Sequence, residues 1–252
     1  MDGMRDVRIW GAVVPLAFLL IGLFQDPLYD ASPLHGVRYG WAIFFFSFGV
    51  LLPIMVMTLI DGHSSRFIRE IGWTANPLPA LLFALVAVSP ALIGFALEAK
   101  INPALEAKEI IWGGLFYPFV EETFFRAVLF GQLYQRAKWG FWPAAMLPAL
   151  LFAAAHMYQS KDPQEMAGIL LITGSGGFIF AYIFKQWGGN IWAPFGVHAG
   201  LNIIWSVFAV GDTALGDWYA NVVRTAAIVL ALGICFVGGR LGWLKPLRHD
   251  PE

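Results

Sequence analysis

Long apolar segments recur along the whole chain, and they constrain its fold more than any other feature. A helix needs about 20 mainly apolar residues to cross the hydrocarbon core of a bilayer. In lipid, every backbone polar group must be satisfied within its own segment, so such segments are expected to be helices. We therefore predict an all-α, polytopic membrane helix bundle with about eight transmembrane helices. The predicted spans are 9–24, 39–60, 78–97, 110–135, 141–157, 166–184, 191–210 and 221–238.

The composition agrees with a membrane protein. Of 252 residues, 58% are hydrophobic and only 13% are charged, whereas soluble domains average about 25% charged residues. The net charge of −1 gives no reason to expect a nucleic-acid partner, and we predict none. The breaks between the apolar segments are too short to hold a second domain. We therefore predict a single integral-membrane domain over residues 1–252, with the lipid bilayer as its main partner.

The distribution of Lys and Arg predicts the orientation of the bundle, because loops on the cytoplasmic side carry an excess of these residues. With Arg126 set aside inside a span, most of the remaining basic residues fall on the side of the N-terminus. We therefore predict a multi-pass protein of the cell membrane with both termini in the cytoplasm. The basic residues on the N-terminal side are Arg5, Arg8, Arg66, Arg69, Arg136, Lys138, Lys185, Arg240, Lys245 and Arg248.

Three charges interrupt the fourth apolar segment, in the stretch "PFVEETFFRAVLF". Ionisable side chains at membrane depth are rare, and they usually face the bundle interior or a wet cavity. Glu122 and Arg126 lie four residues apart, so they can pair on one helical face. Glu121 is turned by about 100° from its neighbour and lacks this local counter-ion. We interpret Glu122 and Arg126 as a structural brace or as support for a site, and Glu121 as a candidate general base or acid.

Two further apolar segments carry histidines. His156 follows Phe152 by one helical turn, and His198 lies four residues before Asn202, so the last two share a face. Taken alone, His156 is more typical of an interfacial residue, and His198 with Asn202 is typical of an interhelical hydrogen-bond pair. Together with Glu121, however, these residues supply a base, a second base or orienting group, and donors for an oxyanion.

The three polar patterns occur in an order that resembles a known family. "EETFFR" at 121–126 fits Glu-Glu-x-x-x-Arg, "FAAAH" at 152–156 fits Phe-x-x-x-His, and "HAGLN" at 198–202 fits His-x-x-x-Asn. The order resembles the CPBP family, which contains type II CAAX prenyl endopeptidases and bacteriocin-processing or self-immunity proteins. The resemblance covers roughly residues 110–210, which we predict to be the catalytic core.

The resemblance implies an intramembrane endopeptidase of the glutamic type, which needs no cofactor. Its expected substrate is a peptide or protein, either membrane-associated or carrying a prenyl group or a leader peptide. The resemblance also implies a role for each polar residue: one pair activates a water molecule, a second stabilises the oxyanion, and a third supports the site. These pairs are Glu121 with His156, His198 with Asn202, and Glu122 with Arg126.

Two alternatives remain open at this point. Glu121, His156 and His198 would also suit a metal-dependent protease with two histidines and one carboxylate, although the sequence has no H-E-x-x-H motif. The second alternative is a non-catalytic membrane protein, either an immunity or scaffold protein or a transporter with a Glu–His proton relay. Transporters often contain an inverted repeat, and none is visible in this sequence.

Overall fold

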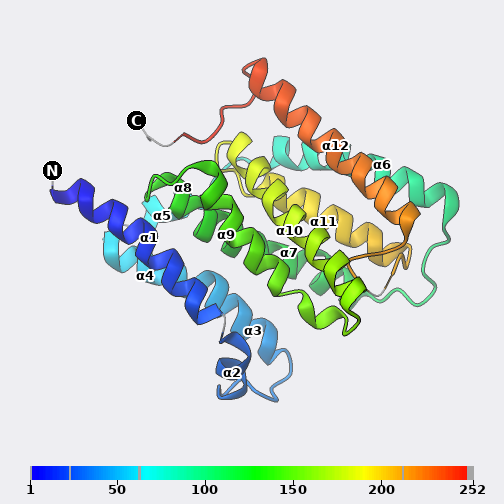
Figure 1. Ribbon diagram of the computed structural model, residues 1–252, viewed down its shortest axis with the longest axis horizontal. Helices are drawn as coiled ribbons and strands as arrows, with labels where there is room; N and C mark the ends of the chain where they lie inside the picture. Colours follow the sequence, from blue (N-terminus) through cyan, green and yellow to red (C-terminus); the bar gives the residue numbers. More distant parts are fainter. Residues whose placement is uncertain (1, 23, 62–63, 212, 249–252) are drawn as a thin grey trace.

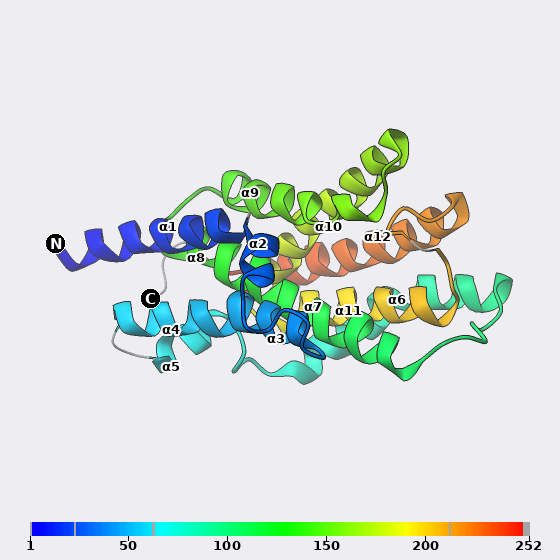
Figure 2. The same ribbon diagram turned by 90° about the horizontal axis from the view of Figure 1, so that it is seen from below.

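The computed structural model describes residues 2–22, 24–61, 64–211 and 213–248, and this part of the chain folds into helices without any strand. The helices pack as one elongated bundle (Figures 1 and 2). The predicted all-α class is therefore confirmed. The description as one domain over residues 1–252, with a core at 110–210, stays a prediction.

The first half of the bundle contains three long helical stretches. The second of them is continuous, because α3, the π-helical segment η1 and α4 follow one another without a break. The elements are α1 (Asp2–Gly22), α2 (Gln25–Asp30), α3 (Gly40–Phe46), η1 (Ser47–Leu51), α4 (Leu52–Asp61), α5 (Ser64–Glu70) and α6 (Pro77–Glu98).

The second half begins with another continuous helix, in which π-helical and α-helical segments alternate: η2 (Glu109–Phe116), α7 (Tyr117–Glu121), η3 (Glu122–Phe130) and α8 (Gly131–Gln135). The remaining elements are α9 (Phe141–Ala154), the short 3₁₀ turn η4 (Met157–Gln159), α10 (Pro163–Gln186), α11 (Trp192–Val207) and α12 (Trp218–Arg240).

Local sequence explains where several of these helices begin. Asn76 and Asp162 each precede a proline, and each side chain accepts hydrogen bonds from backbone N–H groups of the first turn. Asp217 caps α12 in the same way, through the N–H of Ala220. An Asx side chain at the cap and a proline at the first helical position are both favourable, because the first N–H groups have no partner within the helix.

Each predicted span contains a helix, but the helices differ in how well they suit a membrane crossing. Five of those described are long and apolar enough: Gly40–Ile60, Pro77–Glu98, Phe141–Gln159, Pro163–Gln186 and Trp218–Arg240. The first predicted span falls within α1 (Asp2–Gly22), in which Ile9–Phe18 is the apolar stretch among the residues whose side chains the structure describes. The fourth carries the buried charges, and α11 in the seventh has 16 residues. The number of eight spans therefore stays a prediction.

Successive long helices run in alternating directions (Figures 1 and 2). The loops that follow α5 and α10 meet at one end, where the Asn190 side chain donates to the Asn76 carbonyl at 2.9 Å. We call this the α5 end. At the opposite end, the N–H of Asn102 donates to the carbonyl of Val207 at 2.7 Å. The arrangement places the predicted basic loops together, at the α5 end.

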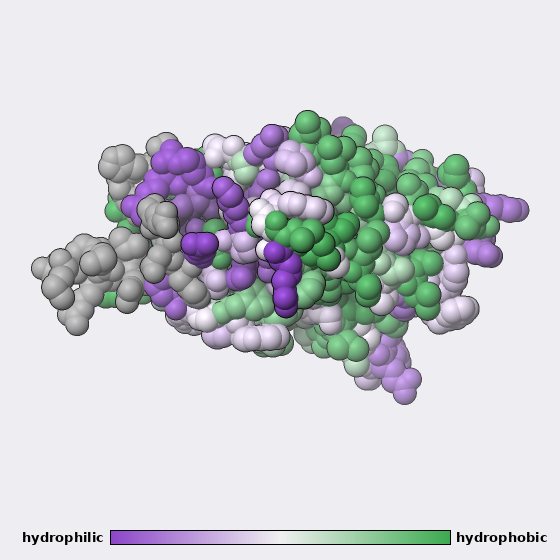
Figure 3. Space-filling view, turned by 90° about the horizontal axis from the view of Figure 1, so that it is seen from above, coloured by the Kyte–Doolittle hydropathy of each residue, from purple (hydrophilic) through white to green (hydrophobic). Residues whose placement is uncertain are grey.

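The core and the outer surface both suit a lipid environment. α9 packs along α10, and α6 contacts α11 and α12. The outward side of α6 exposes large aliphatic side chains, including Leu82, Leu85 and Ile93. Figure 3 shows hydrophobic residues over much of the middle of one face, with hydrophilic ones mainly toward the two ends. Exposed apolar area of this extent is typical of a surface that contacts lipid.

Candidate active site

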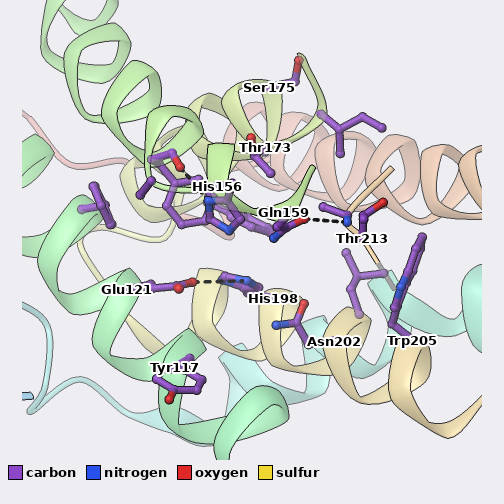
Figure 4. A pocket seen from close by; sticks show the side chains of 18 of the residues that line it. Tyr117, Glu121, His156, Gln159, Thr173, Ser175, His198, Asn202, Trp205 and Thr213 are labelled. Carbon is purple, nitrogen blue, oxygen red and sulfur yellow. Dashed lines mark hydrogen bonds and ion pairs between the residues drawn. The ribbon is translucent and has the colours of Figure 1, made fainter. Parts of the chain in front are cut away.

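A cavity of about 1250 Å³ lies among α7, α9, α10, α11 and α12. The four residues expected to be catalytic, Glu121, His156, His198 and Asn202, all line it. Figure 4 shows Glu121 and His198 facing each other, with His156 on a neighbouring wall and Asn202 farther along α11. Segments 35 to 81 residues apart in the sequence thus contribute to one polar space inside an apolar bundle.

The helix that carries the two glutamates is wound more widely than a regular α-helix. Glu121 ends α7, and η3 begins at Glu122, so the junction falls between them. At the end of η3 the N–H of Gly131 donates to the carbonyl of Arg126, five residues back, as a π-helix requires. Short π-helical segments occur frequently at functional sites. The expected rotation between Glu121 and Glu122 assumed regular α-helical winding, and this winding is absent here.

Glu122 is the most fully enclosed carboxylate of the site, with no exposed area. Its Oε2 lies 3.1 Å from Arg126 Nε, which confirms the expected pair at i,i+4. The two groups form an ion pair without the alignment of a hydrogen bond. Its other oxygen, Oε1, lies 2.8 Å from His198 Nδ1. Glu122 therefore holds two partners, of which the sequence indicated one.

His198 connects the two glutamates. Because an ionised carboxylate only accepts hydrogen bonds, the Nδ1 atom that meets Glu122 carries a hydrogen. The other ring nitrogen, Nε2, lies 3.7 Å from Oε2 of Glu121. His198 stacks on Phe180 with ring centroids 5.1 Å apart, and this contact fixes the plane of the ring. With a carboxylate on each side, the ring donates from Nδ1, and it can also donate from Nε2 when that nitrogen carries a hydrogen.

His156 lies in the turn just after α9, rather than inside the helix as the predicted span 141–157 implies. Its Nδ1 is 2.7 Å from the backbone carbonyl of Phe152. A carbonyl oxygen can only accept, so Nδ1 donates and the neutral ring keeps Nε2 free as an acceptor. The spacing Phe-x-x-x-His thus orients an imidazole that can act as a base.

Arg126 is almost completely buried, and aromatic rings surround its guanidinium. The guanidinium carbon lies 4.4 Å from the ring centre of Phe152 and 5.3 Å from that of Phe180. Such cation–π contacts stabilise a desolvated cation. The same two rings contact His156 and His198, so Arg126 packs behind the site and outside the cavity.

Asn202 links α11 to the helix of the glutamates. Its Nδ2 donates to the carbonyl of Gly113 at 3.0 Å, in the π-helical segment η2. An amide nitrogen has two hydrogens, so one remains for a ligand in the cavity. The side chain is thereby held in place while it keeps one donor for a developing negative charge.

The geometry gives no support to the metal-dependent alternative. Glu121, His156 and His198 line the same cavity, but within the described parts of the chain no three His, Cys, Asp or Glu side chains are grouped so that they could hold a metal ion.

Several further residues line the cavity that the sequence did not single out. Tyr117 precedes Glu121 by four residues, a spacing that could have indicated it. Trp205 and Thr213 lie toward the far end of the cavity in Figure 4. Arg224 also lines it, from the second turn of α12. Its position inside the strongly apolar span 221–238 was a signal that could have indicated it.

The fold and the cavity define a class: a multi-pass, all-helical membrane protein with a buried Glu–His site. Residues 103–204 match the model of a family described as type II CAAX prenyl endopeptidase Rce1-like. This segment contains all three polar motifs, and the match supports the resemblance of the chain to the CPBP family. Proteases make up this family. The comparisons with curated proteins and with solved structures found no match.

Proposed function

We propose that the protein is an intramembrane glutamic-type endopeptidase that cleaves a peptide bond of a membrane-associated substrate. The observation that carries this proposal is the arrangement of Glu121, His156 and His198 around one cavity. Glu121 lies 3.7 Å from the Nε2 atom of His198, and its side chain keeps 19% of its area exposed. It is thus accessible to a water molecule, whereas Glu122 is not.

In the proposed reaction, Glu121 accepts a proton from a water molecule that His156 Nε2 also holds. The hydroxide attacks the peptide carbonyl, and the proton passes on to the nitrogen of the leaving amine. Asn202 Nδ2–H and the Nε2–H of a protonated His198 donate to the oxyanion. Glu122 keeps His198 oriented through Nδ1, and Arg126 holds Glu122. Positioned donors of this kind are often the largest single contribution to acyl-transfer catalysis.

The cavity lining supports a hydrophobic or lipidated substrate. Apart from the polar groups, the walls carry aromatic and aliphatic side chains such as Phe45, Phe124, Leu151 and Ile172. We therefore propose a peptide with a prenyl group or an apolar leader as the substrate class. Binding sites for small apolar groups are typically concave and mainly hydrophobic, with a few placed polar atoms.

The test is cleavage by the purified protein in detergent micelles. A farnesylated peptide and its unmodified counterpart are incubated with the protein, and the products are identified by mass. We expect cleavage of the farnesylated peptide at one bond, unaffected by a chelator. Chelator inhibition that zinc reverses would favour the metal-dependent alternative. The absence of cleavage by folded protein would favour a non-catalytic immunity, scaffold or transport role.

Asn202→Ala should lower kcat by roughly 10²–10³-fold, because it removes one donor to the oxyanion. KM should change little, since the interaction strengthens only in the transition state. Asn102→Ala is a matched control. The Asn102 side chain also donates to a backbone carbonyl on a neighbouring segment, that of Ser206, but Asn102 lies outside the cavity. Equal losses of kcat in both variants would contradict a specific role for Asn202.

We propose that both termini are cytoplasmic and that the protein lies in the cell membrane. The excess of basic residues at the α5 end supports this orientation. Several residues that line the cavity, including Asp26, Tyr158 and Thr213, lie toward the opposite end of the bundle. The proposed orientation therefore places the cavity in the half of the membrane that faces away from the cytoplasm.

Cysteine labelling tests this orientation. The native Cys235 is buried and is replaced by Ala first. Tyr158→Cys should react with a membrane-impermeant maleimide in sealed right-side-out vesicles, because Tyr158 is 83% exposed and lines the cavity. Arg69→Cys, at the α5 end, should react only after the vesicles are opened. The reverse pattern would place the cavity on the cytoplasmic side.

A further inference from the structure

Lys185 places a positive charge at the α5 end of the bundle, in the last turn of α10. The residue is partly buried, and its Nζ lies 6.0 Å from the ring centres of both Tyr134 and Phe141. Among the residues that the structure describes, no carboxylate forms an ion pair with Lys185. The C-terminus of a helix and aromatic rings stabilise a cation only modestly. The charge of Lys185 is therefore left without an anionic partner.

The sequence around this lysine contains basic residues and lacks acidic ones. The stretches 123–161, 166–211 and 218–249 contain no Asp or Glu, and they include α8, α9, most of α10 and the segment that follows α12. On α5, the carboxylate of Glu70 is already paired with Arg66 and Arg136. An anion that neutralises Lys185 is thus best supplied from outside the chain.

The segment after α12 adds two basic side chains beside Lys185. The N–H of Leu247 donates to the carbonyl of Lys185 at 2.7 Å, and the hydroxyl of Tyr134 donates to the carbonyl of Leu247 at 3.4 Å. Lys245 and Arg248 lie within two residues of this contact, and both are exposed. Figure 1 shows the segment returning from the end of α12 toward α8. We call Lys185, Lys245 and Arg248 the α10 cluster.

An exposed apolar stripe on α9 begins next to this cluster. Phe141, whose ring faces the Lys185 ammonium, is the first residue of α9. Trp142, Met146 and Leu150 follow at intervals of four residues, and all three are exposed. Eight residues of helix span about 12 Å at a rise of ~1.5 Å per residue. This length covers most of one leaflet of a hydrocarbon core about 30 Å thick.

We propose that the α10 cluster and the α9 stripe form a binding site for one anionic phospholipid. The headgroup phosphate contacts Lys185, and an acyl chain lies along Trp142 and Leu150. A membrane lipid is the occupant because the cluster lies where the helices end, at the level of the headgroups, and the stripe continues from it into the hydrocarbon region. None of these residues lines the catalytic cavity, so the inference does not depend on the proposed peptidase function.

The charge of the lipid follows from the absence of carboxylates near the cluster. A zwitterionic headgroup brings its own cation next to Lys185, Lys245 and Arg248, whereas an anionic headgroup adds only negative charge. Basic residues near an anionic membrane surface each contribute attraction of similar size. The site should therefore distinguish lipids by net headgroup charge, with chains of the same length.

Lipid binding to the purified protein tests the inference by native mass spectrometry from a nonionic detergent. The probes are phosphatidylglycerol and phosphatidylcholine with identical acyl chains. We expect phosphatidylglycerol to bind about 10-fold more tightly, and Lys185→Gln to weaken its binding about fivefold, the contribution of one basic residue at a membrane surface. Binding of phosphatidylcholine should stay unchanged, and Lys185→Arg should keep the preference. Lys245→Gln is a second variant on an exposed side chain, and it should reduce the preference in the same direction.

The matched control is Lys108→Gln, which removes an exposed lysine at the opposite end of the bundle, where Lys108 pairs with Glu106 at 2.9 Å. It should keep the full preference for phosphatidylglycerol. Equal affinity for the two lipids, or an equal loss in Lys108→Gln and Lys185→Gln, would overturn the inference. Glycerol 1-phosphate carries the phosphate without acyl chains, and it should not displace the lipid at equal concentration. Full displacement would assign the cluster to a soluble phosphate compound and overturn the lipid as its ligand.

Discussion

Glu121→Gln should abolish peptide cleavage while leaving the protein folded. The substitution keeps the size and shape of the side chain, but an amide cannot accept a proton from water. General-base catalysis typically contributes about 10²–10⁴-fold in rate, so kcat should fall by at least that range. The melting temperature should change little, because the side chain is partly exposed and its nearest ionic partner, His198 Nε2, is 3.7 Å away. The measurement is turnover per folded molecule beside thermal unfolding in one detergent.

The control for this variant is Glu109→Gln, which makes the same chemical change on the same long helix, at the start of η2. Glu109 is absent from the lining of the cavity that holds Glu121, so the turnover of this variant should stay near that of the unmodified protein. Glu121→Gln with near-normal kcat would show that another group takes the proton. The other candidate base is Nε2 of His156, because Nδ1 of this ring already donates to the Phe152 carbonyl. His156→Gln would then be the variant to compare.

The sequence predicted the helices and the residues of the site for physical reasons that are local. Apolar runs fix the helices because lipid forces backbone groups to pair within a segment. The positions of Glu122 and Arg126 fix their ion pair, since residues four apart meet on a helix even where the winding widens into η3. The three spaced motifs indicated the residues that now line one cavity, and their catalytic roles stay a proposal.

The contacts between helices could not be derived from spacing. The sequence treated Glu121 and Glu122 as facing apart, with His198 on the oxyanion side. The structure shows His198 between the two carboxylates, at 3.7 Å and 2.8 Å. Only the packing of α11 against the glutamate helix determines this contact. The position of Arg224 in the cavity lining was missed for the same reason, because its partners Ala214 and Leu215 come from a loop whose position local patterns do not encode.

The place of His156 illustrates a third limit. Hydropathy ended its span at residue 157, while α9 ends at Ala154 and His156 lies in the following turn. Helix boundaries are the least reliable part of a sequence-based prediction, because the last turn depends on how its free carbonyls are satisfied. Here the carbonyl of Phe152 accepts from His156 Nδ1. The same hydrogen bond ends the helix and orients the imidazole.

Arg126→Ala should destabilise the protein by about 3–5 kcal/mol, the usual cost of removing one partner from a buried ion pair. Glu122 has no exposed area, and it would keep only His198 as a partner. The packing of the guanidinium between Phe152 and Phe180 would be lost as well. Arg126→Met separates the two effects, because it fills much of the space between the rings without the charge. Both variants are compared with the unmodified protein by chemical unfolding in one detergent.

Arg66→Ala is the matched control for this prediction. Arg66 and Glu70 have the same spacing of four residues and a similar separation, 3.0 Å, but the Arg66 side chain is 52% exposed. Exposed pairs contribute only about 0–1 kcal/mol, and Glu70 keeps its second partner, Arg136, at 2.7 Å. A loss from Arg126→Ala no larger than that from Arg66→Ala would mean that the buried pair does not stabilise the fold. Because Glu122 also orients His198, the stability lost in Arg126→Ala should come with lower turnover per folded molecule, whereas Arg66→Ala should leave turnover unchanged.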